Sequence, residues 1–256
     1  MGSANSVQEL SGNVAVVTGA AQGIGEAIAR RFAAHGARVI IADKQLDKAE
    51  RVAQEIRAAG HEAQPAYVDI AEPENVRALR ARVRDIYGPV SLLVNNAAVI
   101  PFQDFLSVSW DDWERTLRTN VSGTFYCSRV FLNDMLELGR GNIIIMSSVN
   151  GLRAQTGLSA YNVTKAALIM LAQTMALELA GRNIRVNVIA PGDILTQVVE
   201  NVEDEVKALA NIPLHRWGRP EEVAETALFL ASARSAYTTG SVIACDGGLG
   251  AQLYPS

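Results

Sequence analysis

Apolar residues recur along the chain in short runs, and a longer segment with apolar residues every three or four positions follows most of them. The short runs predict strands that are buried on both faces, and the longer segments predict amphipathic helices. The expected strands are 13–18, 37–43, 62–68, 90–95, 142–147, 184–189 and 241–245. The expected helices are 26–35, 46–59, 72–87, 111–138, 161–180, 199–210 and 220–231.

The alternation of strand and helix predicts the fold class. It is typical of an α/β, Rossmann-type, doubly wound sheet of seven parallel strands between two layers of helices. No linker or repeat interrupts the pattern, so we expect one nucleotide-binding domain over residues 1–256, with an insertion at about 193–217 over the substrate. Ligands bind such sheets beyond the carboxyl ends of the strands, and functional residues should therefore follow strands directly.

Composition excludes several classes of function. The net charge is −4, which leaves no basic excess for nucleic acid. The two cysteines and three histidines match no metal-ligand spacing, so no metal site is expected. The first ten residues do not resemble a signal peptide, and we expect no apolar run to reach the length needed to span a bilayer. We therefore expect a cytoplasmic protein with no membrane partner.

A glycine-rich segment follows the first expected strand. Gly19, Gly23 and Gly25 can form a tight turn that brings the backbone close to a pyrophosphate. The helix after the turn offers free N–H groups and the positive end of its dipole. The turn could also be purely structural, but its place between the first strand and the first helix favours a nucleotide site.

Acidic residues end the next two expected strands. Asp43 can accept hydrogen bonds from the adenosine ribose and would repel a 2′-phosphate, which predicts NAD rather than NADP. Lys44 opposes this prediction, because a cation there could accept the phosphate. Asp69 is a candidate partner for the adenine amino group. Both acids could instead cap the helices that follow them.

Tyr161 and Lys165 share one face of an expected helix, because they are four residues apart. A free tyrosine has a pKa of about 10, and a nearby cation lowers it, so the pair is a candidate acid/base catalyst. Ser148 follows an expected strand, and Asn120 lies within an expected helix, where asparagine is unfavourable. The alternative for Tyr161 and Lys165 is an ordinary surface pair worth a few tenths of a kcal/mol.

Seven features, in this order along the chain, resemble the short-chain dehydrogenase/reductase superfamily. They are TGAAQGIG at 18–25, NNAA at 95–98, Asn120, Ser148, YNVTK at 161–165, PGDILT at 191–196 and DGG at 246–248. Each motif alone is weak, whereas the ordered set extends over residues 11–250. The resemblance implies hydride transfer between a nicotinamide cofactor and a secondary alcohol or ketone.

The resemblance also implies roles for individual residues. Tyr161 would exchange a proton with the substrate oxygen, and Lys165 would hold the nicotinamide ribose and lower the pKa of Tyr161. Ser148 would orient the carbonyl or alcohol, and Asn120 would anchor a water that relays protons. The implied cofactor-binding residues are Gly19, Gln22, Gly23, Ile24, Gly25, Asp43, Asp69, Ile70, Asn96, Ala97, Tyr161, Lys165, Pro191, Gly192, Ile194 and Thr196.

Two residues depart from the family pattern. Ala98 stands where the family commonly has glycine, so the backbone there must accept a methyl group. Asp193 puts an unusual charge at the expected substrate mouth, where it either contacts a polar substrate or faces water. The expected helices 111–138 and 161–180 resemble the family's dimer-forming pair, and 241–250 resembles a second contact, which together imply a homotetramer.

Three functions remain open from the sequence. The favoured one is an NAD-dependent dehydrogenase of a small-molecule secondary alcohol, of the polyol, sugar or hydroxy-ketone class. The second is an NADPH-dependent 3-oxoacyl-[acyl-carrier-protein] reductase, for which Arg129 and Arg153 leave a basic docking surface possible. The third is a non-catalytic NAD(P) sensor, which would have no chemical need for the full set of candidate catalytic residues.

Overall fold

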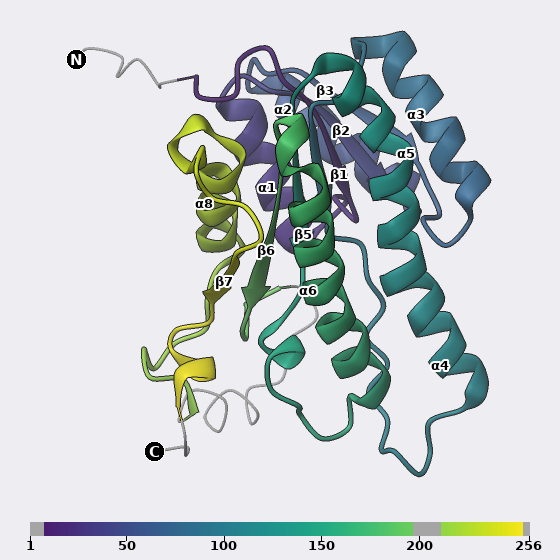
Figure 1. Cartoon of the computed structure of the whole chain (residues 1–256), viewed down its shortest axis with the longest axis vertical. Coiled ribbons are helices and arrows are strands. Elements are labelled where there is room, and N and C mark those ends of the chain that lie inside the picture. The colour runs from purple at the N-terminus through teal and green to yellow at the C-terminus, as the bar shows by residue number, and fades with distance from the viewer. Residues whose placement is uncertain (1–7, 197–210, 253–256) are drawn as a thin grey trace.

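The computed structural model describes residues 8–196 and 211–252. Its seven strands form one parallel sheet, as predicted (Figure 1). Their order in the sheet is β3-β2-β1-β4-β5-β6-β7. The strands are β1 Val14–Thr18, β2 Arg38–Asp43, β3 Ala63–Tyr67, β4 Leu92–Asn95, β5 Gly141–Met146, β6 Ile184–Pro191 and β7 Val242–Cys245. The helices are α1 Gly23–Ala34, α2 Leu46–Ala58, α3 Pro73–Tyr87, α4 Trp110–Leu117, α5 Gly123–Leu138, α6 Ser159–Leu179 and α8 Pro220–Ala231.

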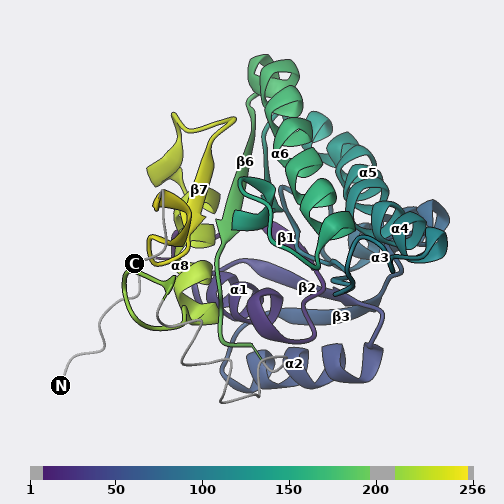
Figure 2. The ribbon, with the colours of Figure 1, turned by 90° about the horizontal axis from the view of Figure 1, so that it is seen from below.

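Helices cover both faces of the sheet (Figure 2). Alternate residues of each strand point to opposite faces. Val17 and Ile41 join a core with α1, α2 and α8, whereas Val16 and Ile40 join a second core with α3, α5 and α6. Because both faces are covered, the central strands are apolar throughout, and this is the pattern from which the sequence predicts them.

The expected helix 111–138 is two helices. A five-residue π turn, Arg118–Ser122, separates α4 from α5 and has Asn120 at its centre. A pattern with a period of 3.6 residues cannot reveal such a turn, although the asparagine inside the expected helix was a local sign of it. The expected helix 199–210 lies outside the described residues, as does most of the expected insertion at 193–217.

One expectation about apolar segments is wrong. By length and composition alone, Ser159–Arg182 is apolar enough to cross a membrane. One face of α6 packs on the sheet through Leu168, Ala172 and Ala176, and the core helix of a soluble protein passes the same test. The outer side exposes Met170 and Leu177, which makes the whole helix apolar.

Candidate active site

A cavity of about 1190 Å³ lies where the carboxyl ends of β1 to β6 meet the following loops. Fifteen of the sixteen predicted cofactor-binding residues line this cavity, and Gly25 is the exception. Of the predicted catalytic residues, Ser148, Tyr161 and Lys165 line it, whereas Asn120 does not.

The glycine-rich turn is held against the end of β4. Gly19 has φ +64, and a Cβ there would lie 2.8 Å from Ala97 Cα. A Cβ at Gly25 would collide with Gly19 O and would lie 2.6 Å from Asn96 Nδ2, so Gly25 serves close packing behind the cavity. Asn96 Nδ2 donates to Thr18 O and Gly19 O, each at 3.0 Å, and thereby fixes the turn.

Thr18 is a positioning residue that sequence reasoning missed. Its Oγ1 accepts hydrogen bonds from Asn96 N at 3.0 Å and Ala97 N at 3.1 Å, which joins the ends of β1 and β4. Its place as the last residue of β1 was the only sign of this role in the sequence.

Ala98, which follows Ala97, lines the cavity without a positive φ, so the methyl group that replaces the family's glycine causes no backbone strain.

The acids at the adenosine end are held by hydrogen bonds. Asp43 accepts from Ala21 N at 3.1 Å and from Gln45 N at 2.9 Å, so it supports the glycine-rich turn and also caps the turn before α2. Asp69 accepts from Ala71 N at 3.0 Å and forms an ion pair with Lys44 at 2.7 Å. Burial raises the pKa of Asp69, but the Lys44 and Ala71 hydrogen bonds outweigh it, and the pKa lies below its ordinary value.

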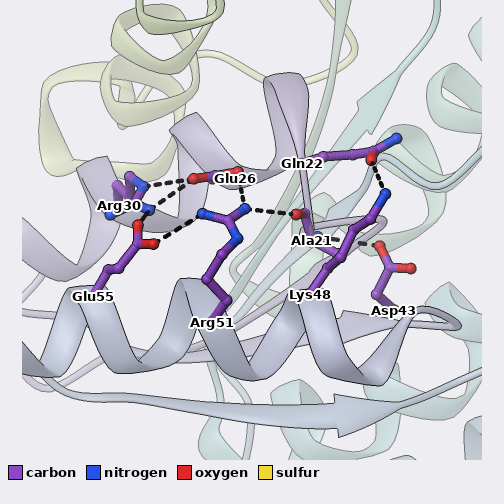
Figure 3. A network of polar contacts seen from close by, with 8 residues as sticks. All are labelled: Ala21, Gln22, Glu26, Arg30, Asp43, Lys48, Arg51 and Glu55. Atoms are coloured by element: carbon purple, nitrogen blue, oxygen red, sulfur yellow. Dashed lines mark hydrogen bonds and ion pairs between the residues drawn. The ribbon is translucent and has the colours of Figure 1, made fainter. Parts of the chain in front are cut away.

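A polar network ties α1 to α2 beside the turn (Figure 3). Lys48 Nζ donates to Gln22 Oε1 at 3.1 Å, and Arg51 contacts Ala21 O at 3.4 Å and Glu26 at 3.2 Å. Arg30 continues the network to Glu26 at 2.7 Å. These contacts position Gln22 at the cavity wall, and they depend on tertiary packing that the sequence pattern does not encode.

Ser148, Tyr161 and Lys165 meet at the other end of the cavity. Ser148 follows β5, Tyr161 lies in the first turn of α6, and both residues line the cavity. Lys165 Nζ lies 5.3 Å from the centroid of the Tyr161 ring and donates to Met146 O at 2.7 Å. Ser147 Oγ also donates to Lys165 O at 2.7 Å, which anchors α6 against β5.

The acid/base properties differ from the sequence-based expectation. Burial raises the pKa of Tyr161, and the Ser148 hydrogen bond opposes this rise only in part. Burial also lowers the pKa of Lys165 to about 8. Burial therefore sets the net direction of the Tyr161 pKa shift, and the lowering by Lys165 that the resemblance implies stays a prediction.

Asn120 lies behind the cavity and is fully buried. Its Oδ1 accepts from Val99 N at 2.8 Å, and its Nδ2 donates to Val99 O at 3.0 Å and Thr164 Oγ1 at 3.1 Å. The side chain thus links the loop after β4 to α6. Its role in a water relay stays a prediction.

The segment after β6 forms the remaining wall. Ser148 Oγ lies 3.5 Å from Pro191 O, and a Cβ on Gly192 would lie 2.8 Å from Asp246 Cβ. Thr196 reaches the glycine-rich turn, where its Cγ2 would lie 3.5 Å from a Cβ on Gly23. Sequence reasoning missed other lining residues, among them Arg115 and Arg118, whereas Trp217 belongs to the expected insertion at 193–217. Within residues 8–196 and 211–252, no cluster of three His, Cys, Asp or Glu side chains could hold a metal.

The cavity fits a dinucleotide cofactor. The glycine-rich turn leads into α1, whose N-terminal N–H groups can receive a pyrophosphate, and Asp43 lines the wall at the end of β2. The bare backbone at Gly19 and Gly23 leaves room for close approach. A long cavity with an adenosine end and an acid/base end is what NAD(P) requires.

Known proteins resemble the chain over nearly its whole length. Residues 19–250 match the sequence model of the family described as Enoyl-(Acyl carrier protein) reductase. The 3-oxoacyl-[acyl-carrier-protein] reductase FabG of Thermotoga maritima is 37% identical over 242 residues, with 94% of this chain and 98% of that protein covered. The galactitol 2-dehydrogenase (L-tagatose-forming) of Cereibacter sphaeroides is 38% identical over 249 residues, with 94% and 96% covered.

A solved structure agrees in fold. The gluconate 5-dehydrogenase of Burkholderia cenocepacia, in complex with NADP and tartrate, has a TM-score of 0.92 and 32% sequence identity, with 96% of this chain and 98% of that chain covered. The resemblance seen in the ordered motifs is therefore confirmed by sequence and by fold. The chain belongs to the short-chain dehydrogenase/reductase superfamily and is an NAD(P)-dependent oxidoreductase that acts on CH–OH groups.

Proposed function

We propose that the chain transfers hydride between NAD(H) and the secondary alcohol of a polyol or sugar, or the corresponding ketone. One observation carries this proposal: Ser148, Tyr161 and Lys165 line one cavity, with the Lys165 ammonium 5.3 Å from the centroid of the Tyr161 ring. Asp193, at the edge of the cavity, can accept hydrogen bonds from a substrate with several hydroxyl groups. The galactitol dehydrogenase among the relatives supports the same class.

The residues have distinct tasks in this mechanism. The nicotinamide ring, when bound, accepts the hydride from the alcohol carbon or returns it to the ketone. Ser148 Oγ orients the substrate oxygen, and Tyr161 Oη takes its proton in oxidation and gives it back in reduction. The structure raises the pKa of Tyr161 by burial, so the base depends on positive charge nearby. Lys165 supplies such charge and is held in place by Met146 O.

NAD is the proposed cofactor, on the strength of Asp43. Its carboxylate lines the cavity and is fixed by two backbone N–H groups, where it would repel a 2′-phosphate. Lys44, the cation that could offset this, is engaged by Asp69. The relative that binds NADP argues the other way, and NADP is therefore a direct competitor in the test below.

We propose a cytoplasmic homotetramer with no nucleic-acid or membrane partner. The outer faces of α5 and α6 expose Phe125, Val163, Met170 and Leu177, and such an apolar face suits contact with a second copy. The edge strand β7 offers a second contact. Light scattering and analytical ultracentrifugation would test the assembly, and a monomer at micromolar concentration would contradict it.

A 3-oxoacyl-[acyl-carrier-protein] reductase is the second candidate. The 37% identity to the Thermotoga maritima enzyme favours it, and the exposed Arg129 and Arg153 could contact an acidic carrier. The position of Asp43 disfavours it, because that reaction is expected to use NADPH.

The test is a substrate panel read at the NADH absorbance band. Neutral polyols, sugars, hydroxy-ketones and a 3-oxoacyl thioester are each offered with NAD+ or NADP+, or with the reduced cofactor. We expect turnover of a polyol or sugar with NAD+. Turnover of only the thioester with NADPH would replace this proposal with the second candidate.

A further inference from the structure

Asp193 occupies a fixed position in the wall formed after β6. Its backbone O accepts from Gly218 N at 3.0 Å, and Leu195 N donates to Gly218 O at 2.8 Å. Just before it, Gly192 N donates to Cys245 O at 3.0 Å. The backbone is thus held on both sides of Asp193, so the side chain starts from a defined point of the wall.

This point lies at the acid/base end of the cavity. Pro191 O, two residues earlier, is 3.5 Å from Ser148 Oγ. Asp193 lines the same cavity as Ser148 and Tyr161. We therefore expect a substrate that extends beyond Ser148 and Tyr161 along this wall to meet the Asp193 carboxyl.

The carboxyl of Asp193 has no partner among the described residues. Several other charges of the cavity wall do have partners: Lys44 pairs with Asp69, and Arg118 with Glu72. Asp111 and Glu114, by contrast, line the wall without an ion pair in the part of the chain that the structure describes. Lys165 donates to Met146 O instead of to a carboxylate. Asp193 is exposed to solvent at the cavity edge, and partial desolvation there raises the pKa of its carboxyl with no cation to offset the rise. An unpaired carboxylate in such a place can accept hydrogen bonds from a ligand.

We propose that Asp193 selects the substrate by charge: it accepts hydrogen bonds from the hydroxyl groups of neutral polyols and rejects substrates that carry a carboxylate. This inference rests on the proposed function and narrows it. A substrate carboxylate beside the unpaired Asp193 carboxylate is repelled by it, whereas a neutral hydroxyl group is not. This difference in binding free energy would discriminate neutral polyols from acidic substrates. The chain should therefore differ in specificity from its relative that is a gluconate 5-dehydrogenase.

The test compares sorbitol with gluconate, which share a six-carbon chain and differ in one carboxylate. We measure kcat/KM for both with the wild type, Asp193→Asn and Asp104→Asn. Asp104 is exposed and does not line the cavity, so its variant makes the same change of charge elsewhere. We expect the wild type to prefer sorbitol, Asp193→Asn to reduce that preference at least about tenfold, and Asp104→Asn to leave it unchanged.

An unchanged preference in Asp193→Asn would overturn the inference, as would a wild type that prefers gluconate. The preference for sorbitol over gluconate is also measured as a ratio of binding affinities, from the competition of the two compounds for the enzyme–NADH complex of the wild type and of each variant. If no polyol is turned over, the proposed function fails, and these binding ratios still decide whether Asp193 selects by charge.

Discussion

The two ends of the cavity treat charge differently. At the adenosine end, Lys44 pairs with Asp69, and Asp43 receives two backbone N–H groups. At the acid/base end, Lys165 has a backbone carbonyl as its hydrogen-bond partner, and Asp193 has none among the described residues. Paired charges suit recognition of a constant ligand, whereas a buried cation without a counter-ion in the described part of the chain, such as Lys165, keeps a reactive group poised.

The energies of the two ends differ accordingly. The Lys44 side chain is 62% exposed, and exposed ion pairs contribute about 0–1 kcal/mol. Lys165 is 3% exposed, and its pKa falls from 10.5 to about 8. Changes at the acid/base end should therefore have larger effects than changes at the adenosine end.

The largest effect is expected for Lys165→Met. The variant removes the cation beside Tyr161, so the phenol loses support for its deprotonated form, and turnover should fall at least about 100-fold. The matched control is Lys48→Met, which removes a lysine outside the cavity that contacts Gln22. Steady-state kinetics of both variants measure the difference. Equal losses would show that the position of the charge is irrelevant.

The same variant should be more stable than the wild type at pH 7. Folding lowers the pKa of Lys165. While the lysine is protonated in both the folded and the unfolded state, its burial therefore reduces the free energy of unfolding by about 3 kcal/mol. The cost is present in full below about pH 8 and disappears as the pH rises towards 10.5. Urea unfolding at pH 7 and pH 10 measures the difference in free energy of unfolding between the variant and the wild type. A difference that does not narrow as the pH rises would contradict the assignment.

The smallest effect is expected at the adenosine end. Asp69→Asn releases Lys44, which can then approach a 2′-phosphate, and the affinity ratio should shift towards NADPH by up to about fivefold. Both cofactors contain adenine, so loss of an adenine contact cancels in this ratio. Adding Lys44→Gln should remove the shift. Fluorescence titration with NADH and NADPH measures the affinity ratio. A shift that survives in the double variant would contradict the role of Lys44.

Much of this arrangement is readable from the sequence. The strands are buried on both faces, so their apolar runs predict the sheet, and residues directly after the strands predict the cavity. The π turn at Asn120 was not predictable, because hydrophobic periodicity does not detect one extra residue in a helix. The Lys44–Asp69 ion pair and the net direction of the Tyr161 pKa shift also could not be predicted from the sequence. Both depend on how neighbouring loops pack and exclude water.

The most direct test of the central claim is Tyr161→Phe, which removes one hydroxyl and keeps the ring. NADH binding and single-turnover hydride transfer are measured on the variant and the wild type, with the alcohol that the panel identifies. The account predicts unchanged NADH affinity and a rate lower by about 100-fold or more, because the proton has no acceptor. Near-normal hydride transfer in Tyr161→Phe would contradict it.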